Sequence, residues 1–196
     1  MKSPAKLACI AALAVLSACA GAPPTRLITL DDGRPQIAGA SSAPSIAVVR
    51  ANVPERIDRS QLVMRTDSNL MTLSEQYRWA EPLRRAIPRV VANDLGEFLD
   101  SNRIAALPTD AAGYDVDYKL MLDFQQLDAI AGQGVDVDVL WRVEHRSGNA
   151  IVGRSSFRQP VAGTATDYPV LAAAQRQALR RVATEIAKEI AAYQKG

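Results

Sequence analysis

The sequence predicts an α+β domain in which a single mixed or antiparallel sheet carries two helices packed on one face. Several segments alternate apolar with polar residues, which is typical of half-buried strands. Two longer segments repeat apolar residues at steps of three and four, the spacing of a helix with one buried face. The order is strand, hairpin, helix, three strands, helix, and one sheet with both helices on the same side would bury every apolar stripe.

The folded part is predicted to begin with a strand and a hairpin. Ile46 to Val53 is apolar and rich in β-branched residues, and Pro54 ends it. Gln61 to Thr66 and Leu70 to Leu73 are two short runs about a Thr66-Asp67-Ser68-Asn69 turn. These runs therefore predict two paired strands.

A helix is predicted next, from about Pro82 to Asn102. Its apolar stripe consists of Leu83, Ile87, Val90, Val91, Leu95, Phe98 and Leu99. Pro82 suits the first turn, where a missing N–H costs nothing. Pro88 does not suit the interior, so we expect either a kink there or a helix that starts late.

Three strands should follow as an antiparallel meander. Apolar and charged residues alternate in the first two, a period of two that defines half-buried strands. The apolar positions are Val116, Tyr118, Leu120, Leu122 and Phe124, then Val135, Val137, Val139, Trp141 and Val143. A tight Ser147-Gly148-Asn149 turn leads into the third strand, Ile151 to Phe157.

A long second helix is predicted at the end of the chain. It starts near Asp167-Tyr168-Pro169, with Asp167 as the expected N-cap. Its apolar stripe is Leu171, Ala174, Ala178, Leu179, Val182, Ile186, Ile190 and Tyr193. The outer face is expected to carry Arg176, Arg180, Arg181 and Glu185.

Residues 1–18 have the features of a secretion signal. Lys2 and Lys6 precede an uninterrupted apolar run from Leu7 to Leu16, too short to span a bilayer. Leu16-Ser17-Ala18-Cys19 is similar to the lipobox of bacterial lipoproteins. That resemblance implies cleavage before Cys19, a thioether-linked diacylglycerol on its sulfur, and an N-acyl chain such as palmitate on its amine. The alternative is an ordinary secreted protein with a chance cysteine.

The composition is that of a globular protein, with 48% hydrophobic and 22% charged residues. Removing Lys2 and Lys6 from 23 basic residues leaves 21, equal to the 21 acidic residues, so nucleic-acid binding is not expected. One cysteine remains after cleavage, which excludes a disulfide within the domain. Residues 19–45 are rich in Ala, Gly, Pro and Ser and predict a flexible tether, with Thr25 to Leu30 as a short edge strand within it. The domain proper is predicted over residues 46–196.

Two segments carry a family resemblance. They are Val53-Pro54-Glu55-Arg56-Ile57-Asp58-Arg59-Ser60-Gln61-Leu62-Val63-Met64-Arg65 and Tyr77-Arg78-Trp79-Ala80-Glu81-Pro82-Leu83. With the lipobox and the Ala-rich last helix, they make the chain similar to the PqiC/YmbA-like ABC-type transport auxiliary lipoproteins. The chain departs from the family at Gln126-Leu127, where a second aromatic residue is usual.

The resemblance implies a non-enzymatic component, lipid-anchored on the periplasmic face of the outer membrane. It would assist an MCE-domain protein and an inner-membrane permease in lipid transport between the two membranes. A homo-oligomeric ring is one arrangement that the resemblance implies. No cofactor is expected beyond the covalent lipid on Cys19. A periplasmic lipid-binding protein and a periplasmic hydrolase are the alternative functions.

Four residues are candidates for binding a partner: Trp79, Arg78, Arg56 and Arg59. Trp and Arg are frequent among the residues that dominate interfaces. The alternative for Trp79 is a side chain that covers the end of the sheet. Arg56 and Arg59, with Asp58 and Arg65, could instead form a self-paired surface.

Two further sets of residues favour ordinary structural roles. Asp115 and Asp117, and Asp136 and Asp138, sit at alternate strand positions, which indicates the water-facing side of a sheet rather than metal ligands. His145 is the single histidine, and no Gly-x-Ser-x-Gly elbow accompanies it. We therefore predict no catalytic and no metal site.

Overall fold

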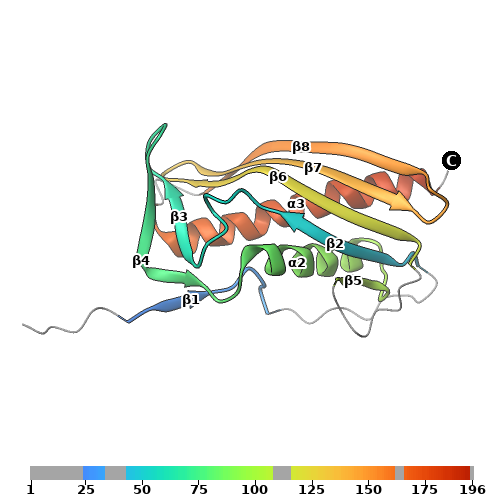
Figure 1. The fold of residues 1–196 in the computed structure, drawn as a ribbon, viewed down its shortest axis with the longest axis horizontal. Coiled ribbons are helices and arrows are strands. Elements are labelled where there is room, and N and C mark those ends of the chain that lie inside the picture. The colour runs from blue at the N-terminus through green and yellow to red at the C-terminus, as the bar shows by residue number, and fades with distance from the viewer. Residues whose placement is uncertain (1–23, 34–42, 108–115, 162–165, 195–196) are drawn as a thin grey trace, which may run out of the picture.

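The computed structural model describes residues 24–33, 43–107, 116–161 and 166–194 (Figure 1). The predicted leader, Cys19 and Asp115 lie outside the described residues.

A long strand, β6 (Tyr118–Ile130), is the centre of the sheet. Along one side it pairs antiparallel with β7 (Gly134–His145), which pairs in turn with β8 (Ala150–Pro160). The predicted meander is therefore confirmed, with each strand longer than its sequence pattern indicated. The alternation is also confirmed, because the apolar residues of β6 and β7 named above from Tyr118 onward are buried.

The other side of β6 holds two groups of strands. Its first half pairs parallel with β2 (Ile46–Asn52), and β2 pairs with the short β5 (Ile104–Ala106). Its last residue pairs with β3 (Gln61–Arg65), followed by β4 (Met71–Trp79) and β1 (Arg26–Ile28). The sheet is mixed, as predicted.

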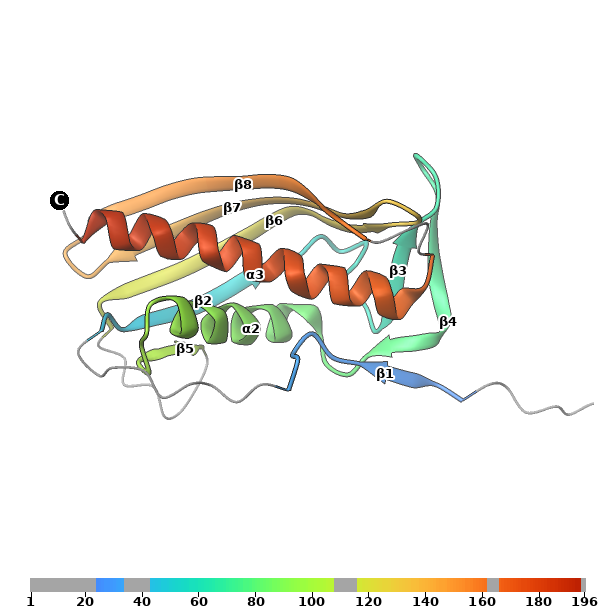
Figure 2. The ribbon, with the colours of Figure 1, turned by 180° about the vertical axis from the view of Figure 1, so that it is seen from behind.

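The two helices lie on one face of the sheet (Figures 1 and 2). Helix α2 (Leu83–Phe98) packs on β2 and β5, and α3 (Tyr168–Tyr193) packs on β6, β7 and β8 and on α2. A continuous apolar core fills the space between helices and sheet. The predicted α+β architecture is confirmed.

The hairpin is longer than predicted, because β4 continues to Trp79. Its register against β3 slips between the Val63–Leu73 and Gln61–Arg78 pairs. At this irregularity the Ser74 hydroxyl accepts hydrogen bonds from the backbone N–H groups of Gln76 (3.3 Å) and Tyr77 (2.8 Å). The irregularity interrupts the alternation of side chains, which hides the second half of the strand from a pattern search.

Helix α2 ends four residues before the predicted boundary. Asp100 has a left-handed backbone (φ 49°), and the N–H of Ser101 donates to the carbonyl of Gly96 at 2.9 Å. This pair of features is the usual hydrogen-bonded stop of a helix. The expected late start is wrong, since the helix begins at Leu83 and includes Pro88 in its second turn.

Asp167 is the N-cap of α3 as predicted, but its side chain makes no capping hydrogen bond. The proline that follows in the first turn needs no partner for a backbone N–H, which lessens the need for a cap.

Candidate functional site: the docked N-terminal segment

The segment that precedes the domain is held against it. Strand β1 pairs parallel with the end of β4, from Arg26 opposite Tyr77 to Ile28 opposite Trp79. The N–H of Ala80 adds a hydrogen bond to the carbonyl of Ile28 at 2.9 Å. Leu30 follows with 1% of its surface exposed, in the core. The predicted edge strand is therefore present, and it is part of the fold.

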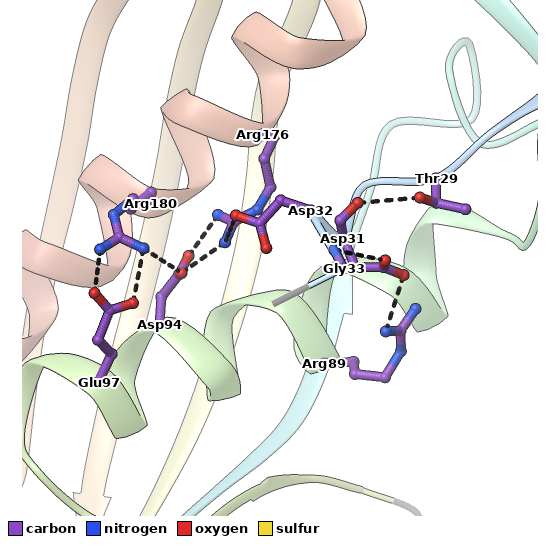
Figure 3. Close-up of polar contacts among 9 residues, drawn as sticks. All are labelled: Thr29, Asp31, Asp32, Gly33, Arg89, Asp94, Glu97, Arg176 and Arg180. Carbon is purple, nitrogen blue, oxygen red and sulfur yellow. Dashed lines mark hydrogen bonds and ion pairs between the residues drawn. The ribbon is translucent and has the colours of Figure 1, made fainter. Parts of the chain in front are cut away.

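Two acids after β1 join this segment to both helices (Figure 3). Asp31 lies 3.3 Å from a guanidinium nitrogen of Arg89 on α2, and Asp32 lies 3.4 Å from one of Arg176 on α3. The Asp31 side chain also accepts from the N–H of Gly33 at 3.3 Å. Arg89 is shared, because it pairs with Glu81 as well. The N-terminal segment thus lies across the helix pair.

Asp94 on α2 is the centre of the charge cluster. Each of its oxygens is 2.7 Å from a nitrogen of Arg176, and one oxygen is 3.3 Å from Arg180. Its side chain is 2% exposed. Arg180 also forms a two-point pair with Glu97 at 2.9 and 2.5 Å, and this hydrogen bond raises the pKa of Arg180 above its usual value. Arg176 and Arg180 were expected on an outer face, and the structure instead turns them toward α2.

A groove of about 600 Å³ separates β1 from the first half of α3. Apolar parts of Leu27, Ile28, Tyr77 and Ala172 form much of its wall. Arg176 also lines it, and the Nε of that arginine is buried without a hydrogen-bond partner among the described residues. The groove therefore combines a mostly apolar wall with one arginine side chain.

The profile of the ABC-type transport auxiliary lipoprotein component family matches residues 29–187. The match begins just after β1 and covers α2, most of α3 and the remaining strands, which is most of the chain. The chain belongs to this family. Membership supports an accessory role as a lipoprotein, anchored to a membrane of the cell envelope and associated with an ABC-type transport system. It also favours a non-enzymatic role.

Solved structures agree on the fold of this auxiliary lipoprotein. A crystal structure of an uncharacterized protein superposes with a TM-score of 0.69 at 17% identity, covering 86% of this chain and 99% of that one. A protein of the DUF330 family from Xanthomonas campestris superposes with a TM-score of 0.56 at 22% identity, covering 84% and 90%. No curated protein matches the sequence significantly.

The two segments that carry the family resemblance are neighbours in the auxiliary lipoprotein. Arg78 pairs with Gln61 across the hairpin, and its guanidinium donates to the Ser60 hydroxyl at 3.3 Å. The N–H of Trp79 donates to the carbonyl of Ser60 at 2.7 Å. The Trp79 indole is buried in the core, which favours the alternative in which it covers the end of the sheet. Arg78 is half-buried beside it.

Arg56 and Arg65 converge on one buried carboxylate. The Asp128 side chain is fully buried, 3.2 Å from Arg56 and 2.8 Å from Arg65. Arg56 donates further to the carbonyl of Gln125 at 3.1 Å. These contacts favour the self-paired interpretation for both arginines. Arg59 differs, since it is exposed and makes no ion pair within the described ranges.

The remaining predicted positions have structural partners. Asp136 forms a two-point pair with Arg158 at 2.5 and 2.9 Å, and Asp138 forms one with Arg154 at 2.7 and 2.5 Å. The hydrogen bond from Arg154 lowers the pKa of Asp138. No group of three potential metal ligands occurs in the part of the chain that the structure describes.

His145 lies in the β7–β8 turn region and contacts two neighbours. Its Nδ1 is 2.8 Å from the Ser147 hydroxyl, and its ring lies 4.9 Å from that of Tyr118. Among the described residues, no carboxylate hydrogen-bonds to this ring. Neither described helix has an apolar stretch long enough to cross a membrane.

Proposed function

We propose that the mature protein is an outer-membrane lipoprotein that assists an MCE-type lipid transport system by docking and assembly. Cys19 would carry the diacylglycerol and N-acyl chains, with two or three chains giving lasting attachment. The observation that supports this most directly is the docked N-terminal segment. The chain becomes part of the fold seven residues after the lipobox cysteine, so the lipid holds a folded module close to the bilayer.

The proposed partners are an MCE-domain protein and an inner-membrane permease, which together with this subunit would bridge the periplasm. Arg59 and the exposed part of Arg78 are the candidate contacts, because Arg56 and Arg65 already share Asp128. Capture from detergent-solubilised envelope after cross-linking should recover both partners. Arg59→Glu should reduce the recovery, whereas Arg142→Glu on β7 serves as the matched control. Recovery of neither partner would contradict the partnership.

Labelled palmitate tests the anchor. We expect label in the wild-type protein and in Cys9→Ser, whose change lies within the leader, but none in Cys19→Ser. The Cys19→Ser protein should move to the soluble periplasmic fraction. Sedimentation of Cys19→Ser with membranes, together with an unlabelled wild-type protein, would refute the proposed lipidation.

The identity of the membrane is tested by one residue. In a sorting system of the enterobacterial type, Ala20 after the cysteine directs a lipoprotein to the outer membrane, whereas Asp retains it at the inner one. Ala20→Asp should therefore shift the protein between membranes on a density gradient. Deleting the gene should also increase outer-membrane permeability, and wild-type permeability under several envelope stresses would argue against the role.

The groove beside β1 favours a second candidate, lipid binding by the domain itself. The groove wall is largely apolar and includes the Arg176 side chain, whose guanidinium would attract a lipid phosphate oxygen. Native mass spectrometry of the Cys19→Ser protein should then detect bound lipid, and Leu27→Asp should reduce it. Lipid-free protein would eliminate this candidate.

A further inference from the structure

The chain between the lipobox cysteine and β1 is short. Seven residues lead from Cys19 to Arg26, and even fully extended they reach ~25 Å. Helix α3, with 26 residues, is about 39 Å long. If Cys19 is held in a bilayer, the start of β1 therefore lies within ~25 Å of that bilayer at any tilt of the domain. This distance is shorter than helix α3.

The start of β1 marks one end of the molecule (Figures 1 and 2). The β3–β4 turn, strand β4 and the first turn of α3 lie at the same end, while the last turn of α3 and the β7–β8 turn lie at the opposite end. We call the first group the anchor-proximal end. Tyr168 connects the first turn of α3 to strand β4. Its ring lies 6.0 Å from the ring of Tyr77, and its hydroxyl oxygen lies 3.5 Å from that of Thr72.

Exposed apolar side chains gather at the anchor-proximal end. Of eight exposed large hydrophobic residues in the described part of the chain, four belong to its elements: Leu27, Leu70, Leu73 and Val170. Tyr77 and Tyr168 are half-buried between them, and the Arg26 guanidinium lies 6.0 Å from the Tyr77 ring. Tyr and Arg side chains settle at the boundary between lipid chains and headgroups, and Leu and Val beside them would enter the apolar side of that boundary.

We propose that the anchor-proximal end rests on the lipid surface that holds Cys19 and inserts these apolar side chains at its interface. This inference rests on the acylation proposed above. The short connection keeps the surface at a high effective concentration near the bilayer, so weak apolar contacts suffice to hold it there. The domain then stands with the β7–β8 turn directed away from the bilayer.

Single-cysteine labelling tests the orientation, since Cys19 is the one cysteine of the mature chain and is blocked by lipid. Leu70→Cys and Val152→Cys are matched sites, because the replaced side chains are 58% and 65% exposed. Leu70 lies in the β3–β4 turn, and Val152 lies near the start of β8, beside the β7–β8 turn. The two turns lie at opposite ends of the molecule (Figure 1). Each lipoprotein is purified with its lipid, labelled with an environment-sensitive fluorophore, and reconstituted into phosphatidylethanolamine and phosphatidylglycerol vesicles. Brominated acyl chains then act as quenchers.

The label at position 70 should shift to shorter wavelength and be quenched several-fold more than the label at 152. Equal quenching at both sites, or stronger quenching at 152, would overturn the proposal. Because the Leu70 backbone bonds to Thr66 and Asp67 do not involve its side chain, the fold should be kept, and circular dichroism checks this. If the wild-type protein carries no acyl chain, the anchor proposal fails first. If acylation is present and the labels behave alike, this inference fails alone.

Discussion

Asp94→Asn tests whether the buried carboxylate holds the two helices together. The substitution keeps the size of the side chain but removes the charge that Arg176 and Arg180 share. At 2% exposure, water cannot take the place of the lost carboxylate. Arg176 then keeps one ion pair among the described residues, with Asp32 at 3.4 Å, and its Nε already lacks an acceptor there.

The expected cost follows from this burial. Removing one partner of a buried ion pair destabilises a protein by about 3–5 kcal/mol. Glu97→Gln is the matched control, because Glu97 pairs with the same Arg180 but is 35% exposed, and an exposed pair contributes about 0–1 kcal/mol. The difference between the two variants is about 2–5 kcal/mol. At about 2–4 °C per kcal/mol for a domain of this size, Asp94→Asn should have a Tm about 4–20 °C lower than Glu97→Gln.

Urea unfolding of the Cys19→Ser protein measures both variants without a membrane. Asp94→Asn should cost much less in an Arg176→Met background, because the arginine that depends on the carboxylate is absent there. The reasoning is refuted if Asp94→Asn and Glu97→Gln destabilise the domain equally. It is also refuted if the cost of Asp94→Asn is the same in both backgrounds, since the two side chains would then be uncoupled.

Three further changes probe other parts of the fold by the same unfolding assay. Hydrogen bonds from the backbone N–H and the hydroxyl of Ser45 lower the pKa of Asp117 below its usual 3.8. The stability that Asp117 contributes is therefore present above the unfolded pKa and is lost as the pH falls through the lower folded value. Ser45→Ala removes the hydroxyl but keeps the backbone N–H, so it should remove part of this acid-dependent loss of stability. Gly134→Ala should destabilise strongly, because φ is 122° and a Cβ would lie 2.1 Å from a backbone oxygen of β8. Leu30→Ala should cost about 2–5 kcal/mol and expose β1 to proteases, whereas Leu27→Ala should stay within about 0.5 kcal/mol.

The sequence predicts the elements whose burial repeats regularly. In β6 and β7 one side of each strand faces the helices, so apolar and polar residues alternate and the strands are visible in the pattern. The stripe of α3 is visible for the same reason, except at its end. The prediction of Tyr193 as its last member is wrong, because this residue lies in the final turn of the helix and is 40% exposed. Phe98 is an exception within α2, since it is exposed and the Arg180 guanidinium lies 5.0 Å from its ring.

Elements that depend on distant partners are not visible in this way. Strand β5 has three residues, too few to show a period, and it exists because β2 offers it an edge. Asp94 lies among the apolar residues of α2, where a carboxylate signals a buried partner. The sequence does not show that the partner is Arg176, 82 positions away on the other helix.

The proposed tether shows that composition alone overestimates the length of free chain between Cys19 and the folded domain. Residues 19–45 have the composition of a flexible linker, and over that length a free chain extends to ~85 Å. Asp31 and Asp32 nevertheless form ion pairs with Arg89 and Arg176, which are 58 and 144 positions away in the sequence. Leu30, between β1 and these acids, is buried in the core. Because these contacts fix the chain from Arg26 onward, the free connection to Cys19 shortens to ~25 Å. If Cys19 carries the anchor, the largest distance between bilayer and domain is therefore set by the contacts that hold residues 26–32 against the domain, and not by the composition of the segment that joins them.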